Sequence, residues 1–399
     1  MKFRFIFLFI ITLFLFLTPF FWFKPGEMDL GGDSSRLYFY DPLHYLTSQA
    51  LYAISHSGLG GEGINYFGIP FFLLLAGLKS ILESPTLLIA FVHGFSLSIA
   101  FLSCYLVVKQ LLTQDEENRT KGVIVITEIC AYVAGLYYIF APVSILIWNH
   151  MLLTDNQIFL NPLIFFLLLR YLLTHNIRYL LIVLGITFLF AANFSYIGAP
   201  AFFAFYPLAL LFLVIYLLYV VRKPLPLKGI LVGIFVFFIL HAFHLIPAIA
   251  GLLTPGSATN NSIFSQRAKL DSGLGYFNAL VPGIKPSISL LGLQQMVPLN
   301  FFSFVFIIFP VIFVLGFLWS RRKSMLLTGI FFLISLFFVT ANITTIGLKF
   351  YMLLFHIPGF SMFRVFFGQF MWVYLFFYTL LLGQTLLAVL SRIKKWQGI

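Results

Sequence analysis

Apolar runs recur along the whole chain, separated by short polar or charged breaks. A run of about 20 apolar residues is long enough to cross the hydrocarbon core of a membrane as a helix. Such runs predict spans over 5–23, 86–111, 123–141, 157–174, 179–195, 200–221, 229–252, 301–320, 325–345 and 366–391. We therefore predict an all-α polytopic membrane protein with about ten transmembrane helices, forming a single domain over residues 1–399.

One apolar segment, Tyr66 to Leu82, is too short for a comfortable span and has Pro70 near its start. It stops at Glu83-Ser84-Pro85. If this segment crossed the membrane, every later loop would change sides. We predict instead that it lies in the outer interface or re-enters it.

The positions of the charged residues give the orientation. Lys and Arg favour cytoplasmic loops, and with the spans above the basic clusters "VRKPLPLK" and "SRRKS" lie on the same side as Lys2 and Arg4. Most carboxylates fall on the opposite side. We predict that both termini are cytoplasmic and that the protein is integral to the plasma (inner) membrane. The net charge of +12 is then an orientation signal, and no nucleic-acid partner is needed to explain it.

Composition agrees with this class, because 61% of the residues are hydrophobic, 9% are charged and the mean hydropathy is +1.03. Cys104 and Cys130 lie inside apolar runs and are predicted to be small core residues. The first apolar run has no small-residue cleavage pattern after it, so we expect an uncleaved first helix.

Three outer segments are long, whereas the cytoplasmic loops are short. They are a first outer loop over 24–85 with interfacial helices, a second large outer loop over 252–300, and residues 346–365. Long loops on a rigid scaffold commonly carry binding and catalytic groups, so the functional surface is expected outside.

The stretch "GGDSSRLYFYDP" places two carboxylates in the first outer loop. Asp33 follows Gly31-Gly32, so the backbone can turn tightly there, and both helix capping and close approach to a ligand are open for this residue. Asp41 precedes Pro42, a pair that is typical of a helix start with the carboxylate as N-cap. Capping is the favoured interpretation for Asp41.

Two further groups could carry chemistry. Arg364 follows the Pro358-Gly359 turn just before the last span, where it could reach lipid headgroups or bind phosphate in bidentate fashion. His241 and His244 have a spacing that metals use on one helix face, but no carboxylate or cysteine accompanies them. They are predicted to be core or cavity-lining histidines.

Together these features resemble a known pattern: an apolar first helix, "D33-x7-D41-P42", "GEGINYFGIPF" (residues 61–71) and "HIPGFSMFR" before the last span. The pattern is similar to the membrane core of the GT-C glycosyltransferases, especially the mycobacterial arabinofuranosyltransferase D type and YfhO-like bacterial proteins. The resemblance covers about the first 85 residues and the stretch around Arg364.

The resemblance implies an inverting enzyme that transfers a sugar from a polyprenyl-phosphate donor to a glycan or lipid acceptor on the extracytoplasmic face. It implies Asp33 as the general base and matches Asp41 and Arg364 to substrate-binding positions. Arg36 and His356 lie in the same two segments and are grouped with them as substrate-binding candidates. The expected partners are the lipid-linked donor, the acceptor and membrane lipids. A divalent cation is the candidate cofactor.

Three other functions stay open at this point. A lipid or polysaccharide transporter or flippase would be expected to bury ionisable residues near the middle of its spans, and these spans carry few. A non-catalytic scaffold subunit would keep the same fold. An O-antigen ligase or polymerase would share the donor class, but usually has a larger late outer loop.

Overall fold

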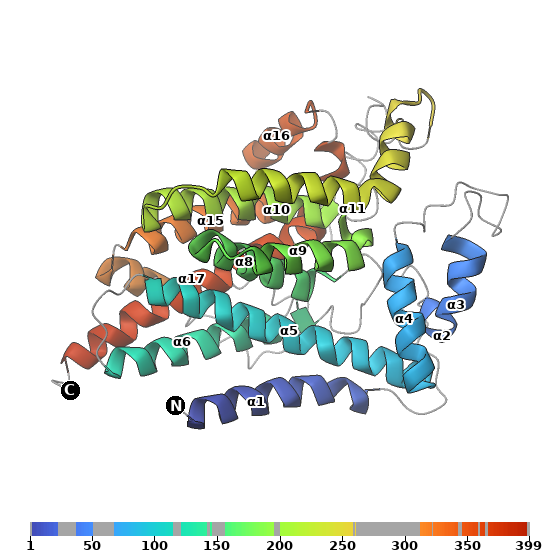
Figure 1. The fold of residues 1–399 in the computed structure, drawn as a ribbon. Coiled ribbons are helices and arrows are strands. Elements are labelled where there is room, and N and C mark those ends of the chain that lie inside the picture. Colours follow the sequence, from blue (N-terminus) through green and yellow to red (C-terminus); the bar gives the residue numbers. More distant parts are fainter. Residues whose placement is uncertain are drawn as a thin grey trace. The chain divides into compact units, whose positions relative to one another are not determined.

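The computed structural model describes residues 2–22, 37–50, 68–114, 121–141, 144–145, 156–194, 200–257, 260, 312–320, 322–341, 345–357, 360–363 and 366–396. Nearly all of these residues are helical and none of them is in a β-strand (Figure 1). The all-α prediction is confirmed for the described part of the chain.

The N-terminal half contains α1 (Lys2–Leu17), η1 (Thr18–Phe21), α2 (Leu37–Tyr40), α3 (Pro42–Tyr45), η2 (Leu46–Ala50), α4 (Ile69–Leu82), α5 (Pro85–Gln114), α6 (Lys121–Phe140), α8 (Gln157–Thr174), α9 (Ile177–Leu189) and η4 (Ala191–Phe194). The C-terminal half contains α10 (Pro200–Ile215), η5 (Tyr216–Val221), α11 (Leu227–Leu253), α15 (Lys323–Thr340), α16 (Thr345–Leu354), η8 (Phe360–Phe363) and α17 (Phe366–Trp396).

Five helices within the described ranges are long and apolar enough to cross a membrane. They are Pro85–Gln114, Gln157–Thr174, Ala204–Val221, Leu227–Leu253 and Gln369–Ile393, and each coincides with a predicted span. Shorter apolar helices at Phe5–Phe21, Ile124–Phe140, Ile177–Leu189 and Lys323–Val339 coincide with four more. These helices support the membrane-protein prediction. The figure of about ten spans stays a prediction, and the predicted span 301–320 lies mostly outside the described residues.

The segment predicted to be interfacial is a separate helix, α4. It has 14 residues and a proline in its first turn. At 1.5 Å per residue it is about 21 Å long, shorter than a hydrocarbon core of about 30 Å. The helix α9 is equally short, with 13 residues, so the interfacial placement of α4 stays a prediction.

The chain divides into two compact units, each described here by itself. Unit 1 comprises residues 1–102, 146–199 and 226–250, and unit 2 comprises residues 103–145, 200–225 and 251–399.

In unit 1, α8 and α9 form a hairpin with a two-residue connection. His175 ends α8 in the left-handed conformation, with φ of 56°. Asn176 then caps α9, because its side-chain oxygen accepts a hydrogen bond from the Arg178 N–H at 3.1 Å. The start of α8 and the end of α9 therefore lie at the same end of the hairpin, which we call the α8 start.

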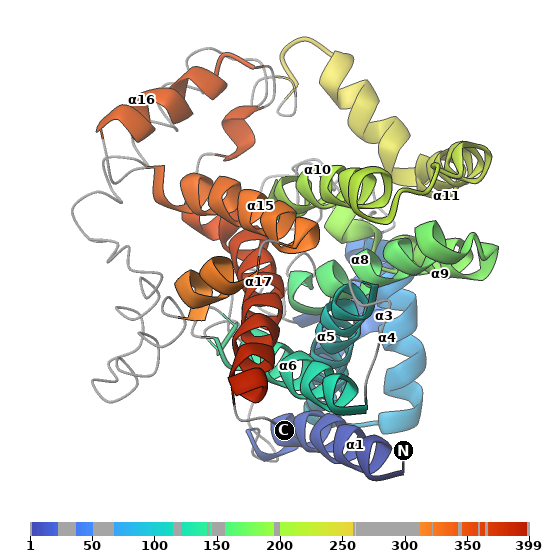
Figure 2. The ribbon, with the colours of Figure 1, turned by 90° about the vertical axis from the view of Figure 1, so that its left-hand side faces the viewer.

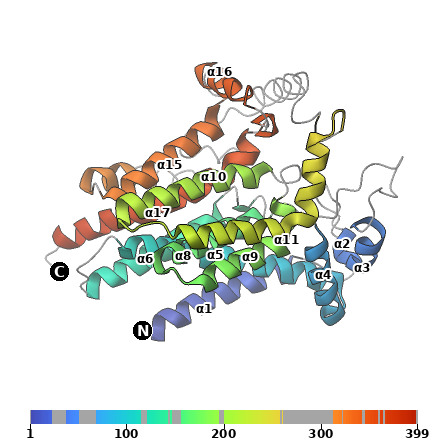
Figure 3. The same cartoon turned by 45° about the horizontal axis from the view of Figure 1, so that its top comes forward.

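Close helix contacts hold α1 and α11 in unit 1. A Cβ at Gly94 of α5 would lie 2.1 Å from the backbone oxygen of Phe16 in α1. A Cβ at Gly233 of α11 would lie 2.9 Å from the side chain of Leu180 in α9. Small residues allow such close packing of membrane helices. Figure 3 shows α11 running beside α9.

Unit 2 is built around α17. Four consecutive residues of this helix, Leu375 to Tyr378, are fully buried, so α17 is covered on all sides. Its neighbours within the unit include α6 and α15, between which it passes in Figure 2. Tyr378 stacks on Tyr137 of α6, with ring centroids 5.0 Å apart, and Phe377 contacts Phe331 of α15 at 5.4 Å.

Candidate functional site

Three of the five predicted site residues, Asp33, Arg36 and Arg364, lie outside the described residues. The other two are described, each in its own unit: Asp41 belongs to unit 1 and His356 to unit 2. The structural evidence on the predicted site therefore concerns the segments that adjoin it.

Asp41 caps a helix, and the capping prediction is confirmed. Its Oδ1 accepts a hydrogen bond from the backbone N–H of His44 at 3.0 Å, and Pro42 occupies the first turn of α3. The side chain is exposed. Local sequence rules placed this residue correctly because a cap depends only on its own helix.

The short helices of the predicted first outer loop are fastened to α4 by aromatic rings. Tyr38 of α2 is almost fully buried and contacts Phe72 of α4, with ring centroids 5.6 Å apart, and Tyr45 of α3 at 5.8 Å. Burial raises the pKa of the Tyr45 phenol. We call α2, α3 and α4 together the aromatic platform.

The aromatic platform is seated at the α8 start. Phe71 of α4 contacts Phe190 at the end of α9, with ring centroids 5.5 Å apart. Phe190 in turn contacts Phe159 of α8 at 5.3 Å, and Phe159 contacts Phe95 of α5 at 6.2 Å. A continuous set of rings thus joins the platform to three helices of unit 1.

His356 lies in the turn that follows α16 and is exposed. Its Nδ1 is 3.1 Å from the carbonyl of Leu353. A carbonyl only accepts, so Nδ1 carries the proton, and in the neutral ring Nε2 is left as an acceptor. Nearby, the buried Tyr351 donates a hydrogen bond to the Phe363 carbonyl, and burial raises the pKa of the Tyr351 phenol. The tyrosine therefore stays protonated and ties α16 to η8.

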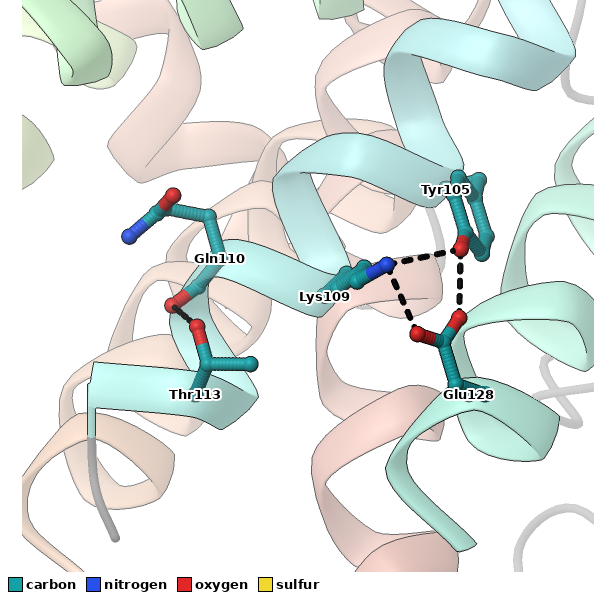
Figure 4. Close-up of polar contacts among 5 residues, drawn as sticks. All are labelled: Tyr105, Lys109, Gln110, Thr113 and Glu128. Carbon is teal, nitrogen blue, oxygen red and sulfur yellow. Dashed lines mark hydrogen bonds and ion pairs between the residues drawn. The ribbon is translucent and has the colours of Figure 1, made fainter. Parts of the chain in front are cut away.

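Sequence reasoning missed a charged centre in unit 2, between α5 and α6 (Figure 4). Lys109 Nζ lies 2.7 Å from Glu128 Oε1. Tyr105 donates a hydrogen bond to Glu128 Oε2 at 2.5 Å, and Lys109 donates to the Tyr105 hydroxyl at 3.1 Å. The Lys109 side chain is 36% exposed and the Glu128 side chain 10%.

The three side chains of this charged centre contact one another. Both oxygens of Glu128 are engaged, and the ammonium of Lys109 also lies 5.3 Å from the Tyr105 ring centroid. A buried carboxylate needs such partners, because leaving one uncompensated is costly. The arrangement joins α5 to α6. Its sequence signal was a lone charge in each of two apolar helices, which cannot by itself identify the partner.

A second group, entirely neutral, lies in unit 1. His241 and His244 of α11 are buried, and His241 Nδ1 is 2.7 Å from His244 Nε2. His241 Nε2 is 3.2 Å from Thr187 Oγ1 of α9, and Thr187 donates its own proton to the Leu184 carbonyl at 3.0 Å.

These contacts fix the proton positions. Because the Thr187 hydrogen is committed to a carbonyl, Thr187 Oγ1 accepts from the Nε2–H of His241. His241 Nδ1 is then an acceptor, so it accepts from the Nε2–H of His244. This series of hydrogen bonds ends at His244 Nδ1, which remains a hydrogen-bond acceptor. The prediction of buried histidines is confirmed, and we call Thr187, His241 and His244 the histidine relay.

Buried amides extend this neutral group toward the α8 start. The side-chain oxygen of Asn193 in η4 lies 3.3 Å from the backbone nitrogen of Asn156, which precedes α8. Phe194, the next residue in η4, contacts His241 with ring centroids 6.0 Å apart. Asn161, one turn into α8, is fully buried. Buried neutral polar side chains thus occur on α8, on η4 and on α11, and the Phe194 ring lies between η4 and His241.

The described residues contain no group of three His, Cys, Asp or Glu side chains that could hold a metal ion. Asp41 uses one oxygen as a cap and the histidines hydrogen-bond each other. The predicted divalent cation therefore has no ligand set within the described residues. Cys104 and Cys130 are buried, as predicted, and neither of them is in a disulfide.

Comparison of the chain with protein-family models, with curated proteins and with solved structures gave no match.

Proposed function

We propose that this protein is a polyprenyl-phosphate-sugar-dependent glycosyltransferase of GT-C type, integral to the plasma membrane. The observation that supports the proposal most is the aromatic platform. Short helices directly follow Asp33 and Arg36 in the sequence, and ring contacts through Tyr38, Phe71 and Phe190 connect these helices to the α8 start. A loop fixed in this way is suited to present a carboxylate at a membrane surface.

In the proposed orientation both termini are cytoplasmic, and the platform and the α8 start lie at the extracytoplasmic face. The short length of α4 supports this orientation, since it lets the basic clusters stay on the cytoplasmic side. About ten spans then complete the membrane domain, with the described helices supplying most of them.

The proposed reaction needs few catalytic groups. The acceptor oxygen forms a bond to the sugar C1 while the bond from C1 to the phosphate oxygen breaks, and polyprenyl phosphate leaves. The acceptor proton passes to the Asp33 carboxylate, a role typically worth about 10²- to 10⁴-fold in rate. Arg364 binds the phosphate, on which negative charge grows as the bond breaks. Arg36, Asp41 and His356 help to hold the substrates.

The proposal is tested with full-length protein in lipid nanodiscs. Transfer from radiolabelled polyprenyl-phosphate sugars is measured for wild type, Asp33→Asn and Arg364→Ala. We expect Asp33→Asn to bind the donor but lose transfer, and Arg364→Ala to bind the donor more weakly. The matched controls are Glu83→Gln and Lys349→Ala, which remove exposed charges predicted to lie on the same face. Normal turnover by Asp33→Asn, or no donor binding by wild type, rules the mechanism out.

The histidine relay is the one observation that favours the rival transport function. Ionisable side chains buried within a span-length helix commonly mark a transport pathway. Under that alternative, liposomes containing the protein would move a lipid-linked sugar between leaflets without any chemical transfer. The relay variant Thr187→Ala would slow that movement, whereas Asp33→Asn would not.

A further inference from the structure

Asn161 is a neutral polar side chain in the interior of unit 1. It lies in α8, is fully buried, and neither its side-chain oxygen nor its nitrogen has a hydrogen-bond partner among the described residues. A buried amide without partners costs free energy, so most such groups in proteins are paired with protein, water or ligand. A molecule that satisfied this side chain would both donate and accept a hydrogen bond.

The backbone next to Asn161 provides a further hydrogen-bond acceptor. Pro162 follows inside the helix and has no N–H, so the carbonyl four residues earlier, at Ile158, lacks its helical donor. Gln157, also buried, lies one turn before Asn161 on the same face. Side-chain and backbone polar groups therefore gather over one turn of a helix that is otherwise apolar.

The chemistry of the surroundings selects the ligand class. The buried polar side chains of α8, η4, α9 and α11 in the described part of unit 1, among them Asn161, Asn193 and the histidine relay, are uncharged amides, a hydroxyl and imidazoles. A phosphate site would be expected to include Arg or Lys, and none of these side chains is cationic. An amide instead presents one donor and one acceptor side by side, which matches two neighbouring hydroxyl groups. Nearby apolar surface comes from the rings of Phe95, Phe159 and Phe190.

We propose that Asn161 binds two neighbouring hydroxyl groups of the sugar, while the phosphate and polyprenyl parts of the donor are held elsewhere. This inference rests on the proposed glycosyltransferase function and assigns its sugar subsite to the α8 start in unit 1.

The test compares binding of two probes to full-length protein in nanodiscs. One is polyprenyl phosphate, and the other is the same lipid carrying glucose, mannose or arabinofuranose. Wild type is expected to bind at least one sugar-bearing lipid more tightly than the bare lipid phosphate. Asn161→Leu keeps the size of the side chain but removes both hydrogen-bonding atoms. It is expected to lose about tenfold in affinity for the sugar-bearing lipid and none for polyprenyl phosphate.

Gln384→Leu is the matched control. Gln384 of α17 is a buried amide in unit 2 whose side-chain atoms also lack partners among the described residues. The same chemical change there should leave the preference for the sugar intact. Neither variant should lower the unfolding temperature, because each removes an unpaired buried amide.

Each outcome separates the two proposals. If Asn161→Leu keeps the wild-type preference, Asn161 binds only water, and the sugar subsite is wrong while the glycosyltransferase proposal stands. If both Leu variants lose the preference equally, the effect is not specific to Asn161 and the inference also fails. If wild type binds polyprenyl phosphate but shows no preference for any sugar, the subsite is again wrong. If wild type does not bind polyprenyl phosphate at all, the proposed function itself fails.

Discussion

Removing Lys109 should destabilise the protein much more when Glu128 is present than when it has been neutralised. Lys109→Met keeps an unbranched chain of similar length but removes the ammonium, which leaves the Glu128 carboxylate with the Tyr105 hydroxyl as its remaining partner in the charged centre. Glu128→Gln removes the negative charge but keeps an oxygen that can accept from Tyr105. The two changes form a double-mutant cycle.

The expected size follows from burial. Removing one partner of a fully buried ion pair costs about 3–5 kcal/mol, and a hydrogen bond to a charged group contributes about 1.5–3 kcal/mol. Lys109 is 36% exposed, which weakens its interaction through solvent screening, so we expect Lys109→Met to cost about 2–3 kcal/mol. Glu128→Gln should cost about 1 kcal/mol, because water can solvate the remaining ammonium. The double variant should lose at most a few tenths of a kcal/mol more unfolding free energy than Glu128→Gln alone. The coupling free energy between Lys109 and Glu128 is then roughly 2 kcal/mol.

The measurement is the free energy of unfolding in mixed micelles, titrated with a denaturing detergent and followed by tryptophan fluorescence. Lys228→Met serves as the matched control, because Lys228 is exposed and its loss should change the stability by less than about 0.5 kcal/mol. Equal costs of Lys109→Met in the wild-type and Glu128→Gln backgrounds would refute the reasoning, since the two side chains would then act independently.

Three other predictions concern local contacts. Gly94→Ala should lower the free energy of unfolding by about 1–3 kcal/mol, because a Cβ there would lie 2.1 Å from a backbone oxygen of α1. Gly77→Ala should raise it by up to about 1 kcal/mol, because a Cβ there would have nothing within 4 Å. Equal effects of the two variants in thermal unfolding would contradict this prediction. Asp41→Ala should increase the rate of amide hydrogen exchange in α3, because the variant loses about 1 kcal/mol of helix capping. Asp41→Asn keeps an oxygen that can cap and should leave the rate unchanged. Similar exchange rates in the two variants would count against the cap. ¹⁵N NMR should find both rings of the histidine relay protonated at Nε2, and Thr187→Ala should shift the His241 signals most; an Nδ1–H form of His241 would overturn the assigned direction.

Features that depend on the neighbouring residues along the chain were predictable. The apolar runs marked the helices and their approximate ends, because a membrane helix satisfies its own backbone hydrogen bonds and needs only length and hydrophobicity. Asp41-Pro42 marked the start of α3 for the same local reason. The short segment before Pro85 forms a separate helix, α4, and its interfacial placement stays a prediction. Charge asymmetry predicted an orientation, which awaits a direct topology measurement.

The partners of each helix could not be predicted. In a membrane protein, side chains that face lipid and side chains that face the core are equally apolar, so periodicity does not show which face is buried. The helices α11 and α17 are both strongly apolar in sequence, yet α17 is enclosed whereas most of α11 is exposed. The buried residues of α11 are Gly233, His241 and His244.

The polar centres follow the same division. Lys109 and Glu128 are 19 positions apart in the printed sequence, and nothing local pairs them; the packing of α5 against α6 does. His241 was visible as a histidine in an apolar run, but its proton position depends on Thr187 from another helix. Hydrophobic patterning was sufficient to predict apolar helices and their approximate ends in the described residues, because those properties are local. The pairing of the lone polar groups depends on how the helices pack, because in an apolar environment each such group must find its partner on a neighbouring helix.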